Sequence, residues 1–201
     1  SLLNDGDCLF FAFSKEQEKK YQVSENISKI LISLNIKNKY DVVILEKTPS
    51  GQALTIKEMV SSLPKVSLKD EAIIINPDQL VFFDLEKIDR TKCAVGLYFN
   101  NASSSCFFDL DMKNNIVKNI KEKEKISYNA SSGVFYFTNT KAILECINWG
   151  IEKQLYHNGE IYLGPCMAYF KELFYFQTLV KFDLGSAYKI NLFKNFFKNV
   201  K

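Results

Sequence analysis

The chain has 201 residues, of which 47% are hydrophobic and 24% are charged, and its net charge is +3. This composition is that of an ordinary soluble globular protein and excludes a disordered or fibrous chain. The length predicts one domain over residues 1–201, with enough chain to bury a sizeable core.

The basic residues are almost all lysines, since Arg90 is the only arginine. Arginine supplies the planar fork that suits phosphate and base recognition, and 26 basic residues are nearly balanced by 23 acidic ones. These observations argue against a dedicated nucleic-acid-binding protein.

Cysteine usage and hydropathy predict a cytoplasmic protein. The five cysteines are widely spaced and form no CxxC pair, so we expect small core residues in a reducing compartment, without a zinc site or a disulfide framework. The apolar run at 8–13 is far too short to cross a membrane, and no basic segment precedes it.

The first third of the chain alternates strand and helix patterns. Ser24 is a candidate N-cap for an apolar stripe at helical spacing, and Pro64 is expected to end the third helix. The alternation predicts a parallel sheet covered by helices. The expected strands are 8–13, 40–46 and 71–76, and the expected helices are 15–22, 24–34 and 51–63.

The middle of the chain has the short strands of antiparallel sheet, with a hairpin turn at 112–115. A closing amphipathic helix is expected over 187–200. The sequence thus predicts a mixed α/β domain. Its other expected elements are strands at 93–100, 105–111, 116–122, 132–137 and 179–184, and helices at 138–154 and 164–174.

Asp78 follows the third strand directly. Pro77 cannot donate to a strand ladder and holds Asn76 extended, so the strand should end there and Asp78 should project at the sheet edge where ligands bind. Position alone leaves two roles open for Asp78, a cap of the following turn or a metal ligand.

Two further loops carry residues of interest. Gly51 and Gln52 precede a helix, where glycine either lets a ligand approach the backbone or merely breaks the chain. Asp183 closes an apolar strand, and two aspartates at two strand ends could share one Mg²⁺.

Three other polar patterns have simpler interpretations. Alternating lysines and glutamates at 121–125 are typical of a solvated edge strand. The Asp109–Leu110–Asp111 trio has a spacing used for metal-bound nucleotides, but its place at a hairpin favours a turn role. His157 has no partner that the sequence identifies, so a surface loop is expected.

Taken in chain order, five short segments resemble motifs of the sugar-phosphate nucleotidyltransferase family, in particular its bacterial branch associated with capsule and cell-surface sugars. They are 48–55 (like T-x-G-A-x-T), 76–79 (N-S-D-Q), 122–137 (E-K, then G-[VI]-Y-x-F), 159–165 (G-E-[FY]-Y-[VL]-x-P) and 183–186 (D-[IL]-G-[TS]). The resemblance covers most of the chain and rests on the order of the matches. It implies a Rossmann-like, GT-A-like three-layer α/β/α fold with a mixed sheet.

The resemblance also implies roles for matching residues. Gly51 and Gln52 would approach the nucleobase, Asp78 and Asp183 would hold Mg²⁺, and Lys123 would contact the acceptor phosphate. The implied reaction is attack by a phosphate oxygen of a phosphorylated sugar or small molecule on the α-phosphate of a nucleoside triphosphate, releasing pyrophosphate. Other residues of the matching motifs would line the nucleotide site, namely Thr48, Gln79, Gly133 and Glu160.

One departure from the family is serious. The family begins with a strand and a glycine-rich G-x-G-x-R loop that cradles the triphosphate, and this sequence contains no such motif. Relative to the family the chain is therefore expected to be N-terminally truncated, with an open sheet edge that a homodimer would cover. Two hypotheses follow, a nucleotidyltransferase or a catalytically deficient relative that binds a nucleotide sugar or a partner protein.

Overall fold

The first two predicted strands form and pair in parallel. The computed structural model describes residues 4–62, 68–102 and 104–198. Cys8 lies opposite Lys39, and Ser14 opposite Leu45, in this ladder. Ser14 also caps the first helix with a capping box. The Ser14 hydroxyl accepts from the Gln17 N–H, and the Gln17 side-chain oxygen accepts from the Ser14 N–H. The elements are β1 (Cys8–Ser14), α1 (Lys15–Tyr21), α2 (Val23–Ser33) and β2 (Lys39–Leu45).

The start of α2 differs from the prediction that Ser24 is its N-cap. The helix begins at Val23, after Gln22 in the left-handed conformation, and the Ser24 N–H donates instead to the Glu18 carboxylate at 2.9 Å. Gln22 alone separates α1 from α2, so α2 begins one residue before the predicted helix at 24–34. Only Leu31 of the predicted apolar stripe is buried, and Leu34 is 64% exposed.

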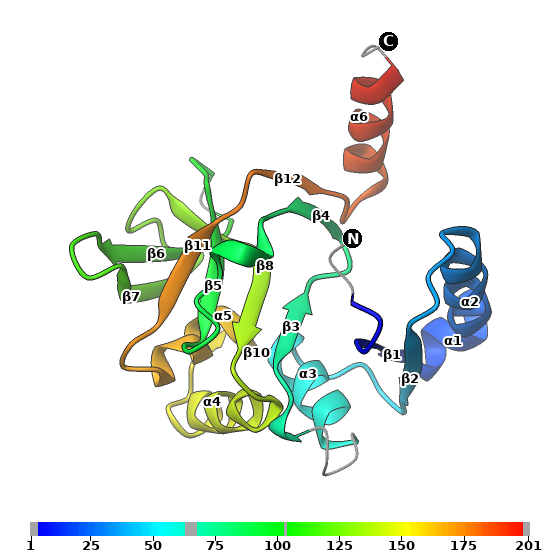
Figure 1. The fold of residues 1–201 in the computed structure, drawn as a ribbon, viewed down its shortest axis with the longest axis horizontal. Coiled ribbons are helices and arrows are strands. Elements are labelled where there is room, and N and C mark those ends of the chain that lie inside the picture. Colours follow the sequence, from blue (N-terminus) through cyan, green and yellow to red (C-terminus); the bar gives the residue numbers. More distant parts are fainter. Residues whose placement is uncertain (1–3, 63–67, 103, 199–201) are drawn as a thin grey trace.

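The third strand does not extend the parallel sheet. After α3 (Gln52–Ser61), β3 (Ala72–Ile75) pairs antiparallel with β8 (Asn129–Phe137), and β1 pairs with β2 alone. The prediction of one parallel sheet from the first three strands is therefore wrong, since no strand of the described residues joins the free edges of β1 and β3. Figure 1 shows β1 and β2 to one side of β3. Pro64 lies outside the described residues.

The main sheet has six strands and is mixed. Its order is β3-β8-β5-β11-β7-β6, in which β11 runs parallel to β5 and the other pairs are antiparallel. The predicted hairpin at 112–115 is confirmed between β6 and β7. Asp111 accepts hydrogen bonds from the N–H groups of Lys113 and Asn114, as its predicted turn role requires. The new elements are β5 (Ala94–Phe99), β6 (Cys106–Asp111), β7 (Ile116–Glu122) and β11 (Phe174–Gln177).

The predicted helix at 164–174 is confirmed only in its first part. Only α5 (Leu163–Cys166) and a 3₁₀ turn (Met167–Tyr169) form, and Phe174 already starts β11. The aromatic run from Phe174 to Phe176 favours a strand, and β11 lies between β5 and β7.

His157 lies in a short hairpin rather than a loop. The remaining elements here are α4 (Thr140–Glu152), capped by Asn139, β9 (Tyr156–His157) and β10 (Glu160–Ile161).

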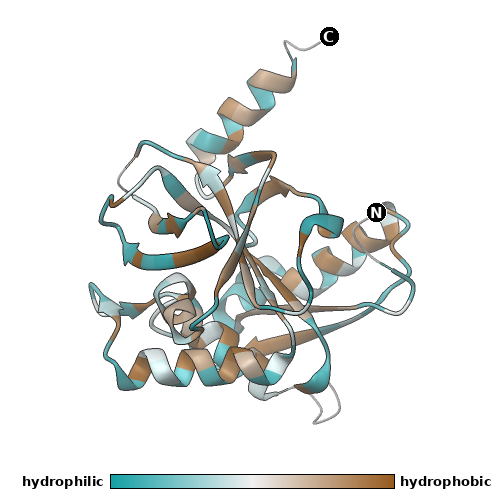
Figure 2. Ribbon diagram, turned by 60° about the vertical axis from the view of Figure 1, so that its left-hand side comes forward, coloured by the Kyte–Doolittle hydropathy of each residue, from teal (hydrophilic) through white to brown (hydrophobic). Residues whose placement is uncertain are grey.

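The core lies where α3 and α4 cover one face of the main sheet. Ile56 and Val60 of α3 and Ile143 and Ile147 of α4 are buried in one cluster with Phe135 and other strand residues. Figure 2 shows apolar residues in brown along the central strands. Four cysteines are buried thiols as predicted (Cys93, Cys106, Cys146 and Cys166), whereas Cys8 is exposed.

The C-terminal part contributes to a two-stranded ribbon and forms a projecting helix. β12 (Val180–Asp183) pairs antiparallel with β4 (Gln79–Phe82), and a 3₁₀ turn (Leu85–Lys87) follows β4. α6 (Ala187–Lys198) confirms the expected closing helix and extends away from the sheets in Figure 1. Of the helices in the described ranges, none combines the length and apolarity that a membrane crossing would require.

Candidate functional site

Asp78 and Asp183 meet at the end of the β4–β12 ribbon. Asp78 is the last of the three residues between β3 and β4, and the ladder places Asp183 opposite Gln79. A Cβ atom built on Gly185 would lie 2.8 Å from Asp78 Oδ2 and 3.3 Å from Asp183 Oδ1. One oxygen of each carboxylate therefore lies beside Gly185, and the two side chains are close to each other.

The Asp78 carboxylate accepts no hydrogen bond from any other group in residues 4–62, 68–102 and 104–198, so the structure provides no support for a capping role. Its main chain does hold the site together, because the Leu184 N–H donates to the Asp78 carbonyl at 2.7 Å. The carboxylate is exposed and remains available to a ligand.

Asp183 is bound through both of its oxygens. The Gly185 N–H donates to Oδ1 at 3.0 Å, and the ammonium of Lys189 on α6 lies 2.5 Å from Oδ2. Partial burial opposes ionisation, but the hydrogen bonds from Lys189 and Gly185 prevail and lower the pKa of Asp183. The carboxylate is thus charged at neutral pH.

The two aspartates fit a magnesium ion. Mg²⁺ prefers oxygen ligands and is held in many enzymes by one or two carboxylates together with substrate phosphates. No cluster of three or more histidine, cysteine or acidic side chains suited to a metal occurs among the described residues. Two carboxylates alone could hold such an ion only if other ligands completed its coordination.

Lys123 and Glu160 are brought together through Tyr162, which the sequence analysis missed. Lys123 Nζ donates to the Tyr162 hydroxyl at 3.1 Å and lies 4.8 Å from the ring centroid, and that hydroxyl donates to Glu160. The hydrogen bond with Tyr162 raises the pKa of Lys123, and the hydrogen bond to Glu160 raises the pKa of Tyr162. Lys123 stays a cation and is exposed, as a side chain that binds an anion must be.

Gln52 contacts the end of β3. Its amide N–H donates to the Asn76 side chain, and its carbonyl accepts from the Leu163 N–H at 3.4 Å. Both ends of this amide are therefore used within the protein. Each end of the amide keeps one further hydrogen-bonding position, a second N–H and a second lone pair, for a nucleobase.

Gly133 packs against Gln79 beside this amide pair. A Cβ at Gly133, where φ is +80°, would lie 2.2 Å from Gln79 Oε1. Gln79 Oε1 is buried and has no hydrogen-bond partner among the described residues. A buried acceptor without a partner is costly, so this oxygen is suited to a donor group on a ligand.

Gly51 lets its loop pack closely against β10. Its φ is +110°, and an added Cβ would lie 2.5 Å from the Ile161 carbonyl oxygen. The Ile161 N–H donates to the Ser50 carbonyl across the same contact. Thr48, earlier in this loop, is exposed and lines a hollow of about 250 Å³ together with Ser14 and Gln17.

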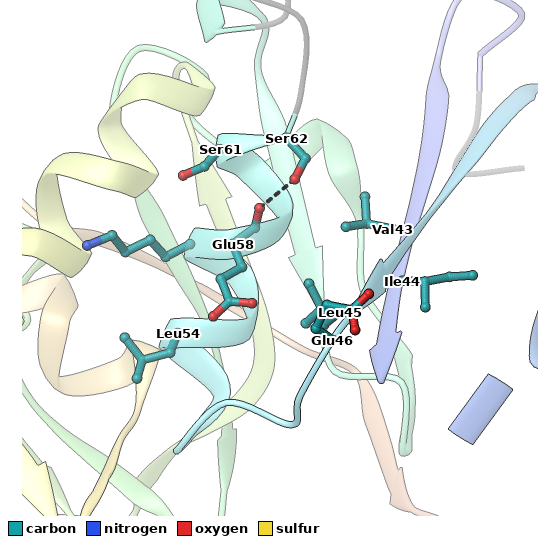
Figure 3. A pocket seen from close by; sticks show the side chains of 9 residues that line it. Val43, Ile44, Leu45, Glu46, Leu54, Glu58, Ser61 and Ser62 are labelled. Carbon is teal, nitrogen blue, oxygen red and sulfur yellow. Dashed lines mark hydrogen bonds between the residues drawn. The ribbon is translucent and has the colours of Figure 1, made fainter. Parts of the chain in front are cut away.

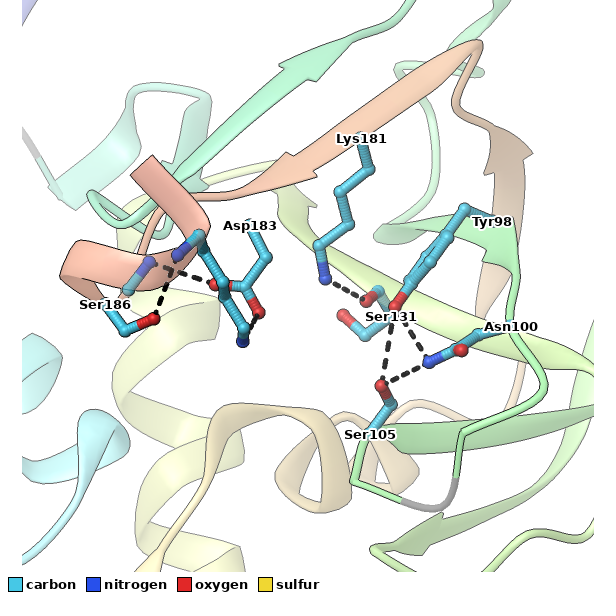
Figure 4. A network of polar contacts seen from close by, with 9 residues as sticks. Tyr98, Asn100, Ser105, Ser131, Lys181, Asp183 and Ser186 are labelled. Atoms are coloured by element: carbon cyan, nitrogen blue, oxygen red, sulfur yellow. Dashed lines mark hydrogen bonds and ion pairs between the residues drawn. The ribbon is translucent and has the colours of Figure 1, made fainter. Parts of the chain in front are cut away.

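A polar network borders the aspartate pair along β12. Lys181 lies two residues before Asp183, donates to the Ser131 carbonyl at 3.4 Å and lies 4.4 Å from the Tyr98 ring centroid. Asn100 donates to the hydroxyls of Tyr98 and Ser105. Figure 4 shows these side chains beside Asp183 and Ser186.

A larger hollow, of about 520 Å³, lies elsewhere, between β2 and α3. Figure 3 shows Val43 and Leu45 on one side of it and Leu54 and Glu58 on the other. No residue predicted for the site lines this hollow. The candidate site is instead the exposed group of side chains around Asp78 and Asp183.

Comparison with solved structures identifies the fold. A nucleoside-diphosphate-sugar pyrophosphorylase from Vibrio cholerae superposes with a TM-score of 0.75 at 18% identity, over 93% of this chain and 80% of that one. The chain has a nucleotidyltransferase fold. The expected α/β class with a mixed sheet is thereby confirmed.

Two other structures agree. CTP:phosphocholine cytidylyltransferase from Streptococcus pneumoniae has a TM-score of 0.64 at 10% identity, with 96% of this chain and 100% of that chain covered. HddC from Yersinia pseudotuberculosis, complexed with GMP-PN, has a TM-score of 0.60 at 16% identity, with 94% and 77% covered. No family model and no curated protein matches the sequence.

Proposed function

We propose that this chain is a magnesium-dependent nucleotidyltransferase that transfers a nucleoside monophosphate from a nucleoside triphosphate to a phosphorylated sugar or similar small molecule. The observation that carries the proposal is the convergence of Asp78 and Asp183 at Gly185 on a nucleotidyltransferase fold. The similar structures include proteins named for nucleotide sugars and for phosphocholine, which supports a phosphorylated acceptor.

In this proposal the chain contributes mainly position and charge. Asp78 and Asp183 would hold Mg²⁺, which neutralises charge on the phosphates. Lys123, held by Tyr162, would bind the acceptor phosphate and keep its attacking oxygen in place. Gln79 Oε1, which has no hydrogen-bond partner among the described residues, would accept a hydrogen bond from the ligand. The setting we propose is cytoplasmic synthesis of cell-surface sugars.

The second hypothesis is a binding module without catalysis. No two of the eight glycines are spaced as G-x-G requires, so the sequence has no G-x-G-x-R loop for the triphosphate. Losing one preorganised donor at such a site costs about 10²-fold or more in rate. Binding without turnover would distinguish this hypothesis from the enzyme.

The test is a thermal-shift titration with each nucleoside triphosphate, with Mg²⁺ and with a chelator, alongside an assay for pyrophosphate release. Ligand at about 100 times its dissociation constant adds about 2.7 kcal/mol, which raises the melting temperature by about 5–10 °C. We expect Asp78→Asn and Asp183→Asn each to weaken magnesium-dependent nucleotide binding about 100-fold or more.

Asp109→Asn is the matched control, because Asp109 is an exposed carboxylate on β6, away from the pair. The enzyme hypothesis is wrong if no triphosphate binds in the presence of Mg²⁺. It is equally wrong if Asp109→Asn removes binding as fully as Asp78→Asn does. Binding without pyrophosphate release would support the binding module.

A further inference from the structure

Lys189 is placed to compete with a metal at Asp183. It lies in the first turn of α6, where its N–H donates to the Ser186 hydroxyl at 3.3 Å, and its ammonium is paired with Asp183 Oδ2. Oδ1 of the same carboxylate already accepts the Gly185 N–H. A magnesium ion coordinated by Oδ2 would require its oxygen ligands at about 2.0–2.1 Å, which leaves no room for the ammonium there.

The ammonium can leave Asp183 without moving the helix. α6 is fixed separately by Phe193 and Phe197, whose ring centroids lie 5.0 and 5.8 Å from that of Phe182 on β12. The lysine stem is flexible, and the pair is open to water, since Lys189 is 47% and Asp183 42% exposed. An exposed ion pair of this kind is weak, so a divalent ion can displace it.

The displaced ammonium would face the phosphates of a ligand bound to the metal. Lys181, two residues before Asp183, is engaged, because it binds the Ser131 carbonyl. Lys189 thus supplies a mobile positive charge next to the aspartate pair, in a sequence without the arginine-bearing phosphate loop.

We infer that Lys189 and Mg²⁺ alternate at Asp183. The ammonium neutralises the carboxylate when the metal is absent, and after the metal displaces it, the ammonium binds a phosphate of the nucleotide. Lys189 is therefore a phosphate-positioning residue that is held at the metal site until the metal and the nucleotide bind. This inference rests on the proposed function, because it takes Asp78 and Asp183 as metal ligands.

The test compares Lys189→Met, which keeps the stem and removes the charge, with Lys194→Met on the same helix. Lys194 is exposed and forms no ion pair with the described residues. Calorimetry would measure Mg²⁺ affinity without nucleotide, and then nucleoside triphosphate affinity at saturating Mg²⁺. We expect Lys189→Met to bind Mg²⁺ up to about fivefold more tightly. We also expect it to bind the nucleotide about tenfold more weakly, and Lys194→Met to change neither affinity.

Each other outcome overturns the inference in a recognisable way. If the wild type binds Mg²⁺ and nucleotide and Lys189→Met leaves both affinities unchanged, the role of Lys189 fails while the proposed function stands. Weaker Mg²⁺ binding by Lys189→Met would show that the lysine merely orients Asp183. If neither protein binds Mg²⁺, the proposed function fails and the inference fails with it.

Discussion

Glu122, the last residue of β7, is partly buried beside the Cys106 thiol. Burial raises its pKa, more than the hydrogen bond with Cys106 and the charge of Lys123 lower it. A carboxyl whose folded pKa is raised favours the folded state below its unfolded pKa, and that advantage is lost as the pH rises through the folded pKa. At neutral pH the ionised Glu122 therefore opposes folding.

Replacing this carboxyl by a neutral amide tests the effect. We expect Glu122→Gln to raise the melting temperature by about 2 °C at pH 7–8. At about pH 4 we expect almost no change, because the wild-type carboxyl is then protonated. Thermal unfolding of both proteins across this pH range is the measurement. A shift of the same size at both pH values would exclude the ionisation argument.

Gly51 is required by its backbone as well as by its neighbours. Alanine at this position would be strained at φ +110° and would drive its Cβ into the Ile161 carbonyl. We expect Gly51→Ala to cost about 3 kcal/mol in urea unfolding. Gly159→Ala is the control, because φ there is also positive at +79° but no atom lies within 4 Å, so about 1 kcal/mol is expected. Equal losses would show that strain alone is responsible.

The sequence predicted the aspartate pair because both residues follow apolar strands, a local pattern. It could not predict Tyr162, because the role of this residue depends on contact between distant segments. Lys189 meets Asp183 across the first turn of α6, and Tyr162 meets Lys123 from a part of the chain about forty residues away. Lys189 could have been suspected, since a helix that begins after Gly185-Ser186 brings its first turn back over Asp183.

Among the elements, α6 depends on few contacts. Its helical pattern was clear from the sequence, but no residue of it is fully buried, and Phe182 is the ring around which Phe193, Phe196 and Phe197 gather. Figure 2 shows polar and apolar residues alternating along it. We therefore expect this helix to be held to the rest of the protein mainly by one aromatic side chain.

Phe182→Ala tests that expectation. Without the ring, amides 190–198 should exchange with solvent about tenfold faster or more, because a short helix without packing is marginal in water. Tyr188→Ala is the control, since Tyr188 is 71% exposed, and it should leave exchange unchanged. Unchanged protection of α6 in Phe182→Ala would mean that other contacts hold the helix.

The predicted helix at 164–174 was too long for a related reason. Hydropathy does not show that the apolar run beginning at Phe174 forms a strand. What decides is the free position between β5 and β7, which Phe174–Gln177 occupies. That position is created by strands that lie far away in the sequence.

For the whole molecule, the α/β class was predictable from alternating patterns, whereas the division of the sheets was not. β1 and β3 each present one unpaired edge among the described residues, although the isoleucine-rich β3 has the composition of a strand buried on both faces. Ile73 is 39% and Ile75 46% exposed. Strand order is set by long-range pairing, which no local pattern encodes.

Hydrogen exchange can test this open edge. The Asn76 N–H donates to the Gly133 carbonyl, so by alternation the Ile74 N–H faces β8 while those of Ile73 and Ile75 face the free edge. In the monomeric protein, amides 73 and 75 should exchange about 100-fold faster than amide 74. Equal protection that persists on dilution would contradict an open edge, and protection that disappears on dilution would indicate a dimer that covers it.

The β4–β12 ribbon has a consequence for folding order. The two carboxylates lie about a hundred residues apart in the sequence, yet one short ladder positions them. During synthesis the core of α3, α4 and the main sheet can assemble before the last twenty or so residues emerge. The site is therefore completed only when the four residues of β12 pair with β4. Ligand binding should act on this final step, favouring the complete ribbon over a chain that has folded without it.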